Sequence, residues 1–293
     1  MPSSQRPLMR FDMDFKIRSA VADFDSHVDR YRRVSLDARR LLRSQLDIPY
    51  GPTMLQRVDV FLPAGGSVDR PLNIFFHGGY WRAFDKGDYS FLAENIVASN
   101  AVAVIANYDL MPSVSMAELL AECRSAVRWC YDNATRFGAS PKRISVSGHS
   151  AGGHIAAILC LTPWSEYGLP VDVIKSTTIV SGIFDLTPIL ESFLADETGL
   201  TPEDAAEFSP ISWVESVNRE LGGITLACGM LETQEFHRQT DAFADKLRAV
   251  GVSVDVLKIL RRHHMDIVFD LGDGACELGR RHIDMVHAVW NRY

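Results

Sequence analysis

Residues 147–153 read Ser147-Gly148-His149-Ser150-Ala151-Gly152-Gly153 and contain a Gly-x-Ser-x-Gly pattern. An apolar strand candidate, Arg143–Ser147, precedes the serine, and an apolar helix candidate, Ala151–Leu161, follows it. A serine on so sharp a turn takes strained backbone angles, and small neighbours let the flanking chain pass close by. The helix N-terminus also places partial positive charge beside the hydroxyl. This context predicts that Ser150 is a nucleophile raised above a sheet, against the alternative of a glycine-rich turn without function.

Outside this stretch the chain alternates short apolar strands with helices. The other expected strands are Val58–Leu62, Pro71–Phe76, Ala101–Tyr108, Val173–Ser181, Gly223–Cys228 and Val252–Ile259. The other expected helices are Tyr89–Ser99, Met116–Phe137, Glu235–Val250 and one at about Arg280–Trp290. Strands that are apolar on both faces indicate a mostly parallel sheet flanked by helices. Together with the serine turn, this predicts the α/β class and the α/β-hydrolase fold.

Two segments are expected to add to this sheet within a single domain spanning residues 1–293. Residues from about 14 to 44 carry apolar side chains at spacings of three and four, which predicts an N-terminal helix. Residues from about 184 to 221 contain three prolines and no clear strand. An excursion of this kind over one face of a sheet is a candidate lid or pocket wall.

A second motif, His77-Gly78-Gly79-Tyr80-Trp81, stands at the end of an expected strand. In hydrolases of this fold such a loop supplies backbone N–H donors to an oxyanion hole, together with the residue after the nucleophile. The predicted oxyanion hole therefore consists of Gly78, Gly79, Tyr80 and Ala151. Glycine suits the loop because a Cβ would hinder close approach to the substrate carbonyl. We expect the His77 ring to anchor the loop rather than act as a base.

A serine hydroxyl needs a base to become a good nucleophile. His263 and His264 follow the last expected strand, where the base of this fold belongs, and we prefer His264. His282 and His287 fall inside an expected helix, where solvent-exposed histidines are the simpler interpretation.

The acid that orients the base is expected between the serine and the histidine in the chain. Glu232 lies in the loop after the strand Gly223–Cys228, the position of the orienting carboxylate, and is preferred. The rival is Asp185, which follows the preceding strand and has a helix cap or a lid brace as its alternative role.

Four aromatic residues near these motifs are candidates for a substrate pocket close to the lid, with core packing as the alternative for each: Trp81, Phe84, Phe184 and Trp213. The His282, Asp284 and His287 group is too loose for a metal site, and no His-Glu-x-x-His motif occurs. The chemistry of a serine hydrolase requires no metal or other cofactor, and none is expected.

The bulk composition limits the partners. The formal net charge is −7 and the isoelectric point is about 5.7, which argues against nucleic acid. No stretch approaches the roughly 20 apolar residues of a membrane span, and Met1–Arg10 lacks a signal-peptide pattern. The five cysteines form no Cys-x-x-Cys pair, which favours a reducing cytoplasm. We expect a small-molecule ester or amide as the partner, and a homo-oligomer is left open.

These motifs resemble the arylformamidase (kynurenine formamidase) group, close to the hormone-sensitive-lipase-like esterases, over most of the chain from Tyr50-Gly51 onward. The loop at residues 77–81 is similar to that group's HGGxW motif, with Lys86 at a lysine position that follows it, and residues 148–154 are similar to its nucleophile elbow. Residues 232–239 resemble an acid loop that usually reads Asp-Ser-Pro-Glu-Phe. His263-His264-Met265-Asp266 resembles an Asn-His-Phe-Asp ending. The sequence departs from the group's pattern at Glu232, Gln234, His263 and Met265.

The resemblance implies a serine hydrolase that cleaves formamides of the N-formylkynurenine type through an acyl-enzyme. A short-chain carboxylesterase is the alternative, because the same residues cleave esters. A non-catalytic binding protein built on a hydrolase fold is the third possibility, and it is disfavoured because nucleophile, base and oxyanion loop are all present.

Overall fold

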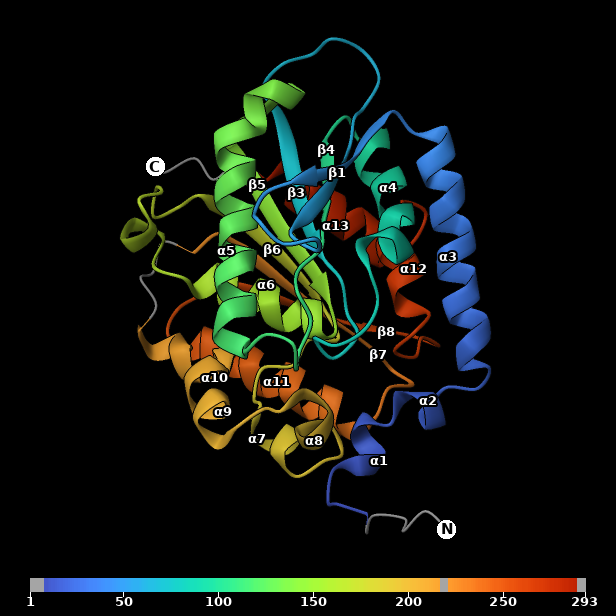
Figure 1. Ribbon diagram of the computed structural model, residues 1–293, viewed down its shortest axis with the longest axis vertical. Coiled ribbons are helices and arrows are strands. Elements are labelled where there is room, and N and C mark those ends of the chain that lie inside the picture. Colours follow the sequence, from blue (N-terminus) through green and yellow to red (C-terminus); the bar gives the residue numbers. More distant parts are fainter. Residues whose placement is uncertain (1–7, 217–220, 289–293) are drawn as a thin grey trace.

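The computed structural model describes residues 8–216 and 221–288, which form a twisted sheet covered by helices (Figure 1). Within these residues the sheet has eight strands in the order β1-β2-β4-β3-β5-β6-β7-β8. β2 pairs antiparallel with β1 and β4, and all later neighbours pair in parallel. The strands are β1 (Ser44–Pro49), β2 (Arg57–Phe61), β3 (Arg70–Phe76), β4 (Val102–Ala106), β5 (Ala139–His149), β6 (Ile174–Val180), β7 (Gly223–Gly229) and β8 (Val254–Ile259). The predicted α/β class and mostly parallel sheet are confirmed.

The helices cover both faces of this sheet. One face carries α4 and α13, which contact each other, and the opposite face carries α5 and α6. Among the described residues, no helix combines the length and the apolar character that crossing a membrane requires. The helices outside the N-terminal and 184–221 segments are η1 (Lys86–Leu92), α4 (Ala93–Ala98), α5 (Met116–Asn133), η2 (Ala134–Phe137), α6 (Ala151–Leu161), η3 (Trp164–Tyr167), α11 (Gln234–Ala249), α12 (Ile267–Leu271) and α13 (Glu277–His287).

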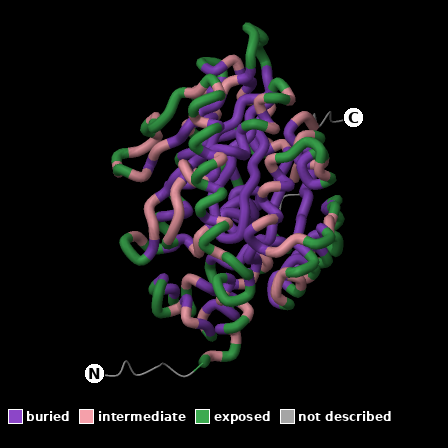
Figure 2. The backbone as a smooth tube through the Cα atoms, turned by 90° about the vertical axis from the view of Figure 1, so that its right-hand side faces the viewer, coloured by how far each residue is buried: buried purple, intermediate pink, exposed green. Residues whose placement is uncertain are grey.

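The central strands form the core. Every residue of β3, β4 and β7 is buried, which is why these segments are apolar on both faces. Figure 2 shows this interior as a continuous buried region beneath exposed helix surfaces. The predicted last helix corresponds to α13, and the predicted and observed ends differ by about one helical turn. Residues 289–290 of the prediction lie outside the described part of the chain.

The N-terminal segment differs from the single helix expected over about 14–44. It forms α1 (Asp12–Phe15), α2 (Ile17–Ala20) and α3 (Phe24–Leu41), followed by strand β1. The helix is interrupted before α3, where Asp23 takes a left-handed conformation with φ of 53°. Strand β1 was not predicted, because it is an edge strand with mostly exposed side chains and so lacks an apolar pattern.

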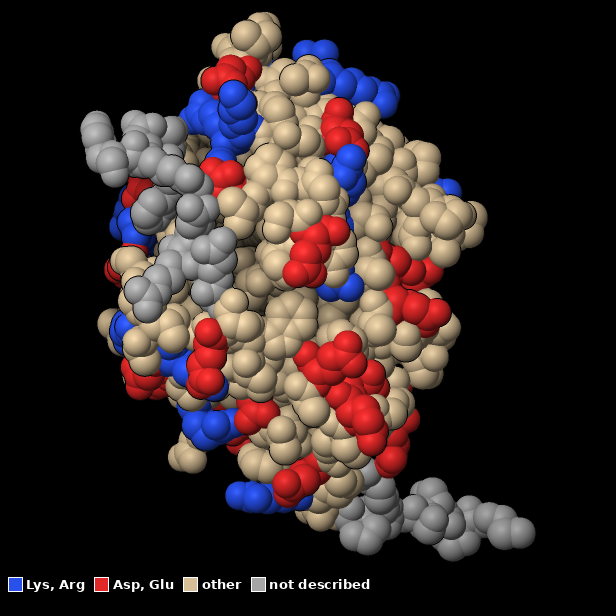
Figure 3. Space-filling model, turned by 90° about the vertical axis from the view of Figure 1, so that its left-hand side faces the viewer, with Lys and Arg blue, Asp and Glu red and all other residues tan. Residues whose placement is uncertain are grey.

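The excursion expected over about 184–221 consists of short helices, and its described residues contain no strand. Residues 217–220 of the expected segment lie outside the described residues. On the face shown in Figure 3, acidic side chains gather at the height of α8 and α9, which carry Asp196, Glu197, Glu203, Asp204 and Glu207. The helices are α7 (Thr187–Leu190), α8 (Leu194–Thr198), α9 (Pro202–Phe208), α10 (Pro210–Trp213) and η4 (Val214–Ser216).

Candidate active site

Ser150 lies on the turn between β5 and α6 with φ of 57° and ψ of −121°, a strained conformation for a residue with a Cβ. Its N–H donates to the Val180 carbonyl at 2.9 Å, which fixes the turn to the neighbouring strand. A Cβ on Gly148 would lie 2.0 Å from the Gly152 carbonyl oxygen, and one on Gly152 would lie 2.0 Å from that of Phe76. Both glycines are therefore required for the serine to stand at this position.

The structure brings Ser150, His264 and Glu232 together in a line of hydrogen bonds. The Ser150 Oγ lies 2.9 Å from the His264 Nε2, and the His264 Nδ1 lies 2.7 Å from the Glu232 Oε2. A carboxylate only accepts, so Nδ1 carries the proton and Nε2 presents its lone pair to the serine hydroxyl. Ser150 follows the carboxyl end of β5, Glu232 follows that of β7 and His264 follows that of β8.

The Glu232 carboxylate is buried and has donors on both oxygens. Its Oε1 accepts from the Gly229 N–H at 2.7 Å and from the Ser181 hydroxyl at 2.6 Å. Burial by itself raises the pKa of Glu232, but the charge and hydrogen bond of His264, aided by Ser181 and Gly229, lower that pKa below its usual value. The group is therefore ionised at neutral pH and can hold the His264 tautomer.

Asp185, the rival acid, has contacts elsewhere. Its Oδ1 accepts from the Thr187 N–H at 3.0 Å at the start of α7, and its Oδ2 lies 3.6 Å from the Arg238 Nη2. These contacts correspond to the alternative role of a cap and brace for the excursion.

The remaining late histidines have structural contacts. The His263 Nδ1 accepts from the Met265 N–H at 3.1 Å within the turn that carries His264. Solvent exposure is wrong for His282, which is buried with its Nδ1 at 3.1 Å from the Thr178 Oγ1. His287 is half-buried, and its Nε2 lies 3.2 Å from the Ser99 Oγ.

The glycine loop, residues 77–81, lies directly against the serine turn. A Cβ on Gly78 would lie 3.1 Å from the Ser150 Cβ, and one on Gly79, where φ is 111°, would lie 2.2 Å from the Ala83 carbonyl oxygen. Ala151 begins α6, and a first-turn N–H has no acceptor within its own helix.

The His77 ring sits in the core beneath this loop. Its Nε2 lies 3.0 Å from the Asn107 Oδ1, and the ring stacks on Tyr108 at 4.3 Å between centroids. The Tyr108 hydroxyl also donates to the His77 carbonyl oxygen at 2.7 Å. These contacts fix the loop from below, as expected of an anchor.

A cavity of about 760 Å³ opens above Ser150 and His264. Of the four aromatic residues expected in the pocket, Phe84 lines this cavity. The others lie elsewhere: Trp81 is buried and donates to the His154 Nδ1 at 3.2 Å, Phe184 stacks on Phe243, and Trp213 lines a different cavity. Core packing, the stated alternative, holds for Trp81 and Phe184.

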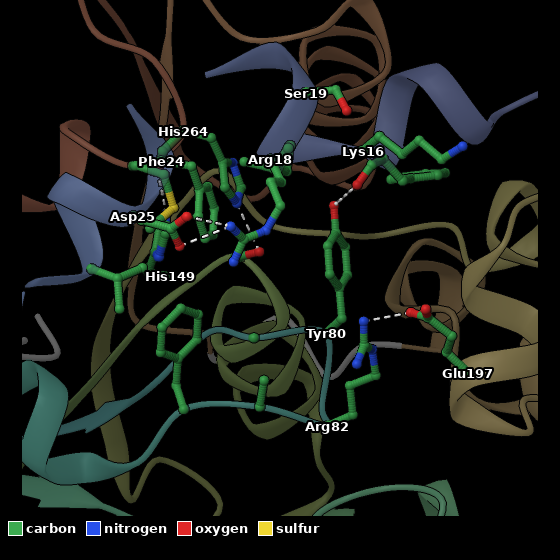
Figure 4. Close-up of a pocket in the computed structure, with 18 of the residues that line it drawn as sticks. Lys16, Arg18, Ser19, Phe24, Asp25, Tyr80, Arg82, His149, Glu197 and His264 are labelled. Atoms are coloured by element: carbon green, nitrogen blue, oxygen red, sulfur yellow. Dashed lines mark hydrogen bonds and ion pairs between the residues drawn. The ribbon is translucent and has the colours of Figure 1, made fainter. Parts of the chain in front are cut away.

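Sequence reasoning missed most of the cavity wall. The N-terminal helices supply Phe15, Arg18, Phe24 and Asp25, and α8 and the residue before it supply Glu197 and Phe193. Figure 4 shows Tyr80 extending from the glycine loop to this segment, where its hydroxyl donates to the Phe15 carbonyl oxygen at 2.8 Å. No local pattern places an N-terminal helix over a serine more than 120 residues later, so only the structure reveals this wall.

Within residues 8–216 and 221–288, no group of three or more His, Cys, Asp or Glu side chains is arranged to hold a metal ion.

Comparison with known proteins identifies the family. The kynurenine formamidase of Danio rerio is 31% identical over 274 residues, which cover 93% of this chain and 89% of that protein. The chain belongs to the kynurenine formamidase family. The Salmo salar member is 30% identical over 86% of this chain and 85% of its own. A family model described as BD-FAE also matches residues 58–167.

Solved structures agree with this fold. A Silicibacter sp. TM1040 protein, provisionally described as a thioesterase, superposes with a TM-score of 0.83 at 26% identity, over 96% of this chain and 100% of that one. A Pyrobaculum calidifontis esterase superposes with a TM-score of 0.68 at 19% identity, over 91% of this chain and 92% of its own. The protein is a serine hydrolase of the α/β-hydrolase fold, and the predicted resemblance, fold and enzyme class are confirmed.

Proposed function

We propose that this enzyme hydrolyses aryl formamides of the N-formylkynurenine type through a formyl-enzyme on Ser150. The observation that carries the proposal is the hydrogen-bonded line from Ser150 through His264 to Glu232, at 2.9 and 2.7 Å, at the base of a partly aromatic cavity. Membership of the kynurenine formamidase family supports the choice of a formamide.

In the first step the Ser150 Oγ attacks the formyl carbon while the His264 Nε2 takes the hydroxyl proton. The buried Glu232 carboxylate stabilises the imidazolium that forms. Negative charge develops on the formyl oxygen, and the backbone N–H groups of the predicted oxyanion hole, contributed by Gly78, Gly79, Tyr80 and Ala151, stabilise that charge.

In the second half of acylation the imidazolium donates its proton to the departing aryl amine as the carbon–nitrogen bond breaks. A water molecule then attacks the formyl ester on Ser150, with His264 as the general base. Formate leaves and the serine regains its proton. The protonation of the amine matters because an amine anion is a much poorer leaving group than an alkoxide.

A short-chain carboxylesterase is the second candidate. It is favoured by relatives named as esterases, such as Mycobacterium tuberculosis LipQ, which is 28% identical over 80% of this chain. The same line of residues cleaves esters, whose leaving group needs less help from His264.

The test compares kcat/KM for N-formylkynurenine with that for p-nitrophenyl acetate and butyrate. We expect substantial formylkynurenine hydrolysis. An ester preference of roughly 10³-fold or more, about 4 kcal/mol in transition-state binding, would assign the enzyme to the carboxylesterases instead.

We further propose that the enzyme works in the cytoplasm. All five cysteines are free thiols, and Cys123, Cys130, Cys160 and Cys228 are buried in the core. Free thiols fit a reducing compartment. Fractionation of the source cells with activity as the readout tests this location.

A further inference from the structure

An ion pair stands on the wall of the cavity that contains Ser150 and His264. The Arg18 Nη1 donates to both carboxylate oxygens of Asp25 at 2.7 Å, and both side chains line the cavity. Figure 4 shows the pair on the same side of the cavity as His264, with Arg82 and Glu197 on the other side. The cavity therefore presents a positive and a negative group next to each other.

This pair is open to a ligand. The Arg18 and Asp25 side chains are 65% and 76% exposed. Within the described part of the chain, the hydrogen bonds of Arg18 run through Nη1 alone, which leaves the Nε–Nη2 edge for a carboxylate. Each Asp25 oxygen accepts one bond and retains a lone pair for a second donor.

The Arg18 side chain is also held in place. Its guanidinium lies 4.6 Å from the centroid of the Phe24 ring, and the preceding residue, Ile17, is buried in the core. Because the Phe24 ring holds the guanidinium and buried Ile17 holds the backbone, the Arg18 side chain loses less conformational entropy when a ligand binds.

The other charged groups of the cavity are committed to structural contacts. The Lys16 Nζ lies 3.8 Å from the Asp12 carboxylate, and the Arg32 Nε lies 3.3 Å from the Asp88 carboxylate. Neither of these two aspartates lines the cavity. Arg82 pairs with Glu197 and so joins the region beside the glycine loop to α8.

We propose that Arg18 and Asp25 recognise the α-amino-acid end of the substrate, on the leaving-amine side of the formamide. The α-carboxylate binds the Nε–Nη2 edge of Arg18, and the α-ammonium donates to Asp25. These two substrate charges share one carbon atom, which matches the direct contact of the two side chains. This inference rests on the proposed formamidase function and assigns recognition of the substrate's amino-acid end to Arg18 of α2 and Asp25 of α3.

The test uses two formamides with the same reacting group. N-Formylkynurenine carries the amino-acid end, and 2-formamidoacetophenone lacks it. In Arg18→Ala and Asp25→Asn we expect kcat/KM for N-formylkynurenine to fall roughly 10- to 100-fold, mainly through KM, because a charge-assisted hydrogen bond is lost. The same substitutions should change kcat/KM for the neutral formamide by less than about 2-fold.

The matched control is Arg128→Ala, which breaks an exposed pair with Asp132 on α5, away from the cavity. This control substitution should leave kcat/KM unchanged for both formamides. Equal losses for the two formamides in Arg18→Ala, or no loss for either, would overturn the subsite while leaving the formamidase function in place.

Kynurenine itself separates the remaining outcomes, as an inhibitor of p-nitrophenyl acetate hydrolysis. If N-formylkynurenine is not cleaved but kynurenine inhibits, with an inhibition constant raised about 10-fold or more by Arg18→Ala, the subsite stands and the formamidase function fails. If kynurenine inhibits both proteins equally or not at all, the subsite is refuted.

Discussion

The substitution Glu232→Gln keeps the size of the side chain and removes its charge, and the structure determines how the amide must lie. The Oε1 position accepts from the Gly229 N–H at 2.7 Å and from the Ser181 hydroxyl at 2.6 Å. The backbone N–H cannot rotate, so the glutamine oxygen takes this position and its NH₂ group faces the His264 Nδ1. His264 must then accept at Nδ1 and carry its proton on Nε2, the wrong tautomer for deprotonating Ser150.

We expect a loss in kcat/KM of roughly 10³- to 10⁴-fold, about 4 to 5.5 kcal/mol in transition-state stabilisation, because both the tautomer and the countercharge are lost. The assay is steady-state hydrolysis of N-formylkynurenine and p-nitrophenyl acetate, with near-ultraviolet circular dichroism as the check on folding. Glu232→Asp, which keeps the charge, should recover part of the activity.

Asp185→Asn is the matched control, since Asp185 is the other carboxylate considered for this role. Its contacts at Thr187 and Arg238 lie in the excursion, so activity should fall less than about 3-fold. If Asp185→Asn is the more damaging substitution, or if Glu232→Gln keeps near-normal kcat/KM, the assignment of the acid is wrong.

Three further predictions concern the turn, pH and metals. Gly152→Ala should abolish activity or soluble folding, because its Cβ would lie 2.0 Å from the Phe76 carbonyl oxygen, whereas Gly66→Ala, with no neighbour within 4 Å, should match the wild type in activity and Tm. Burial lowers the pKa of His154 to about 4. Between about pH 6.5 and pH 4 the unfolded chain therefore binds more protons than the folded chain, so the free energy of unfolding falls as the pH is lowered. At pH 5 the buried imidazole of His154 lowers the free energy of unfolding by about 2 kcal/mol. The drop in Tm from pH 7 to pH 5 should therefore be smaller in His154→Gln than in the wild type. Overnight dialysis against EDTA should leave kcat/KM unchanged, since the proposed steps need no Lewis acid; activity lost in EDTA and restored by zinc or manganese would contradict them.

The motifs with strong local constraints were the predictable part of this molecule. The Ser150 turn and the glycine loop require small residues at fixed positions, because a Cβ on Gly148, Gly152 or Gly79 would overlap backbone atoms. The buried parallel strands show as apolar runs for a similar reason, since both their faces pack against helices.

The cavity wall and the sheet edge depend on long-range packing, and the sequence could not predict them. Strand β1 is exposed and reads as polar chain. Trp81 follows two glycines in a motif near the serine, yet its ring turns into the core to meet His154. Arg18 carries no motif at all and reaches the cavity because α1 and α2 are held over it, partly by the Tyr80 hydroxyl bond to the Phe15 carbonyl.

The most direct test of the central proposal, acyl transfer through Ser150, is stoichiometric labelling with a fluorophosphonate followed by mass spectrometry and formamidase assay of the same samples. We predict that one equivalent attaches to Ser150, that hydrolysis of N-formylkynurenine declines in proportion to labelling, and that Ser150→Ala is neither labelled nor active, with a loss of about 10⁴-fold or more. A fully labelled enzyme, or a folded Ser150→Ala protein, that still hydrolyses N-formylkynurenine at the wild-type rate would contradict the account.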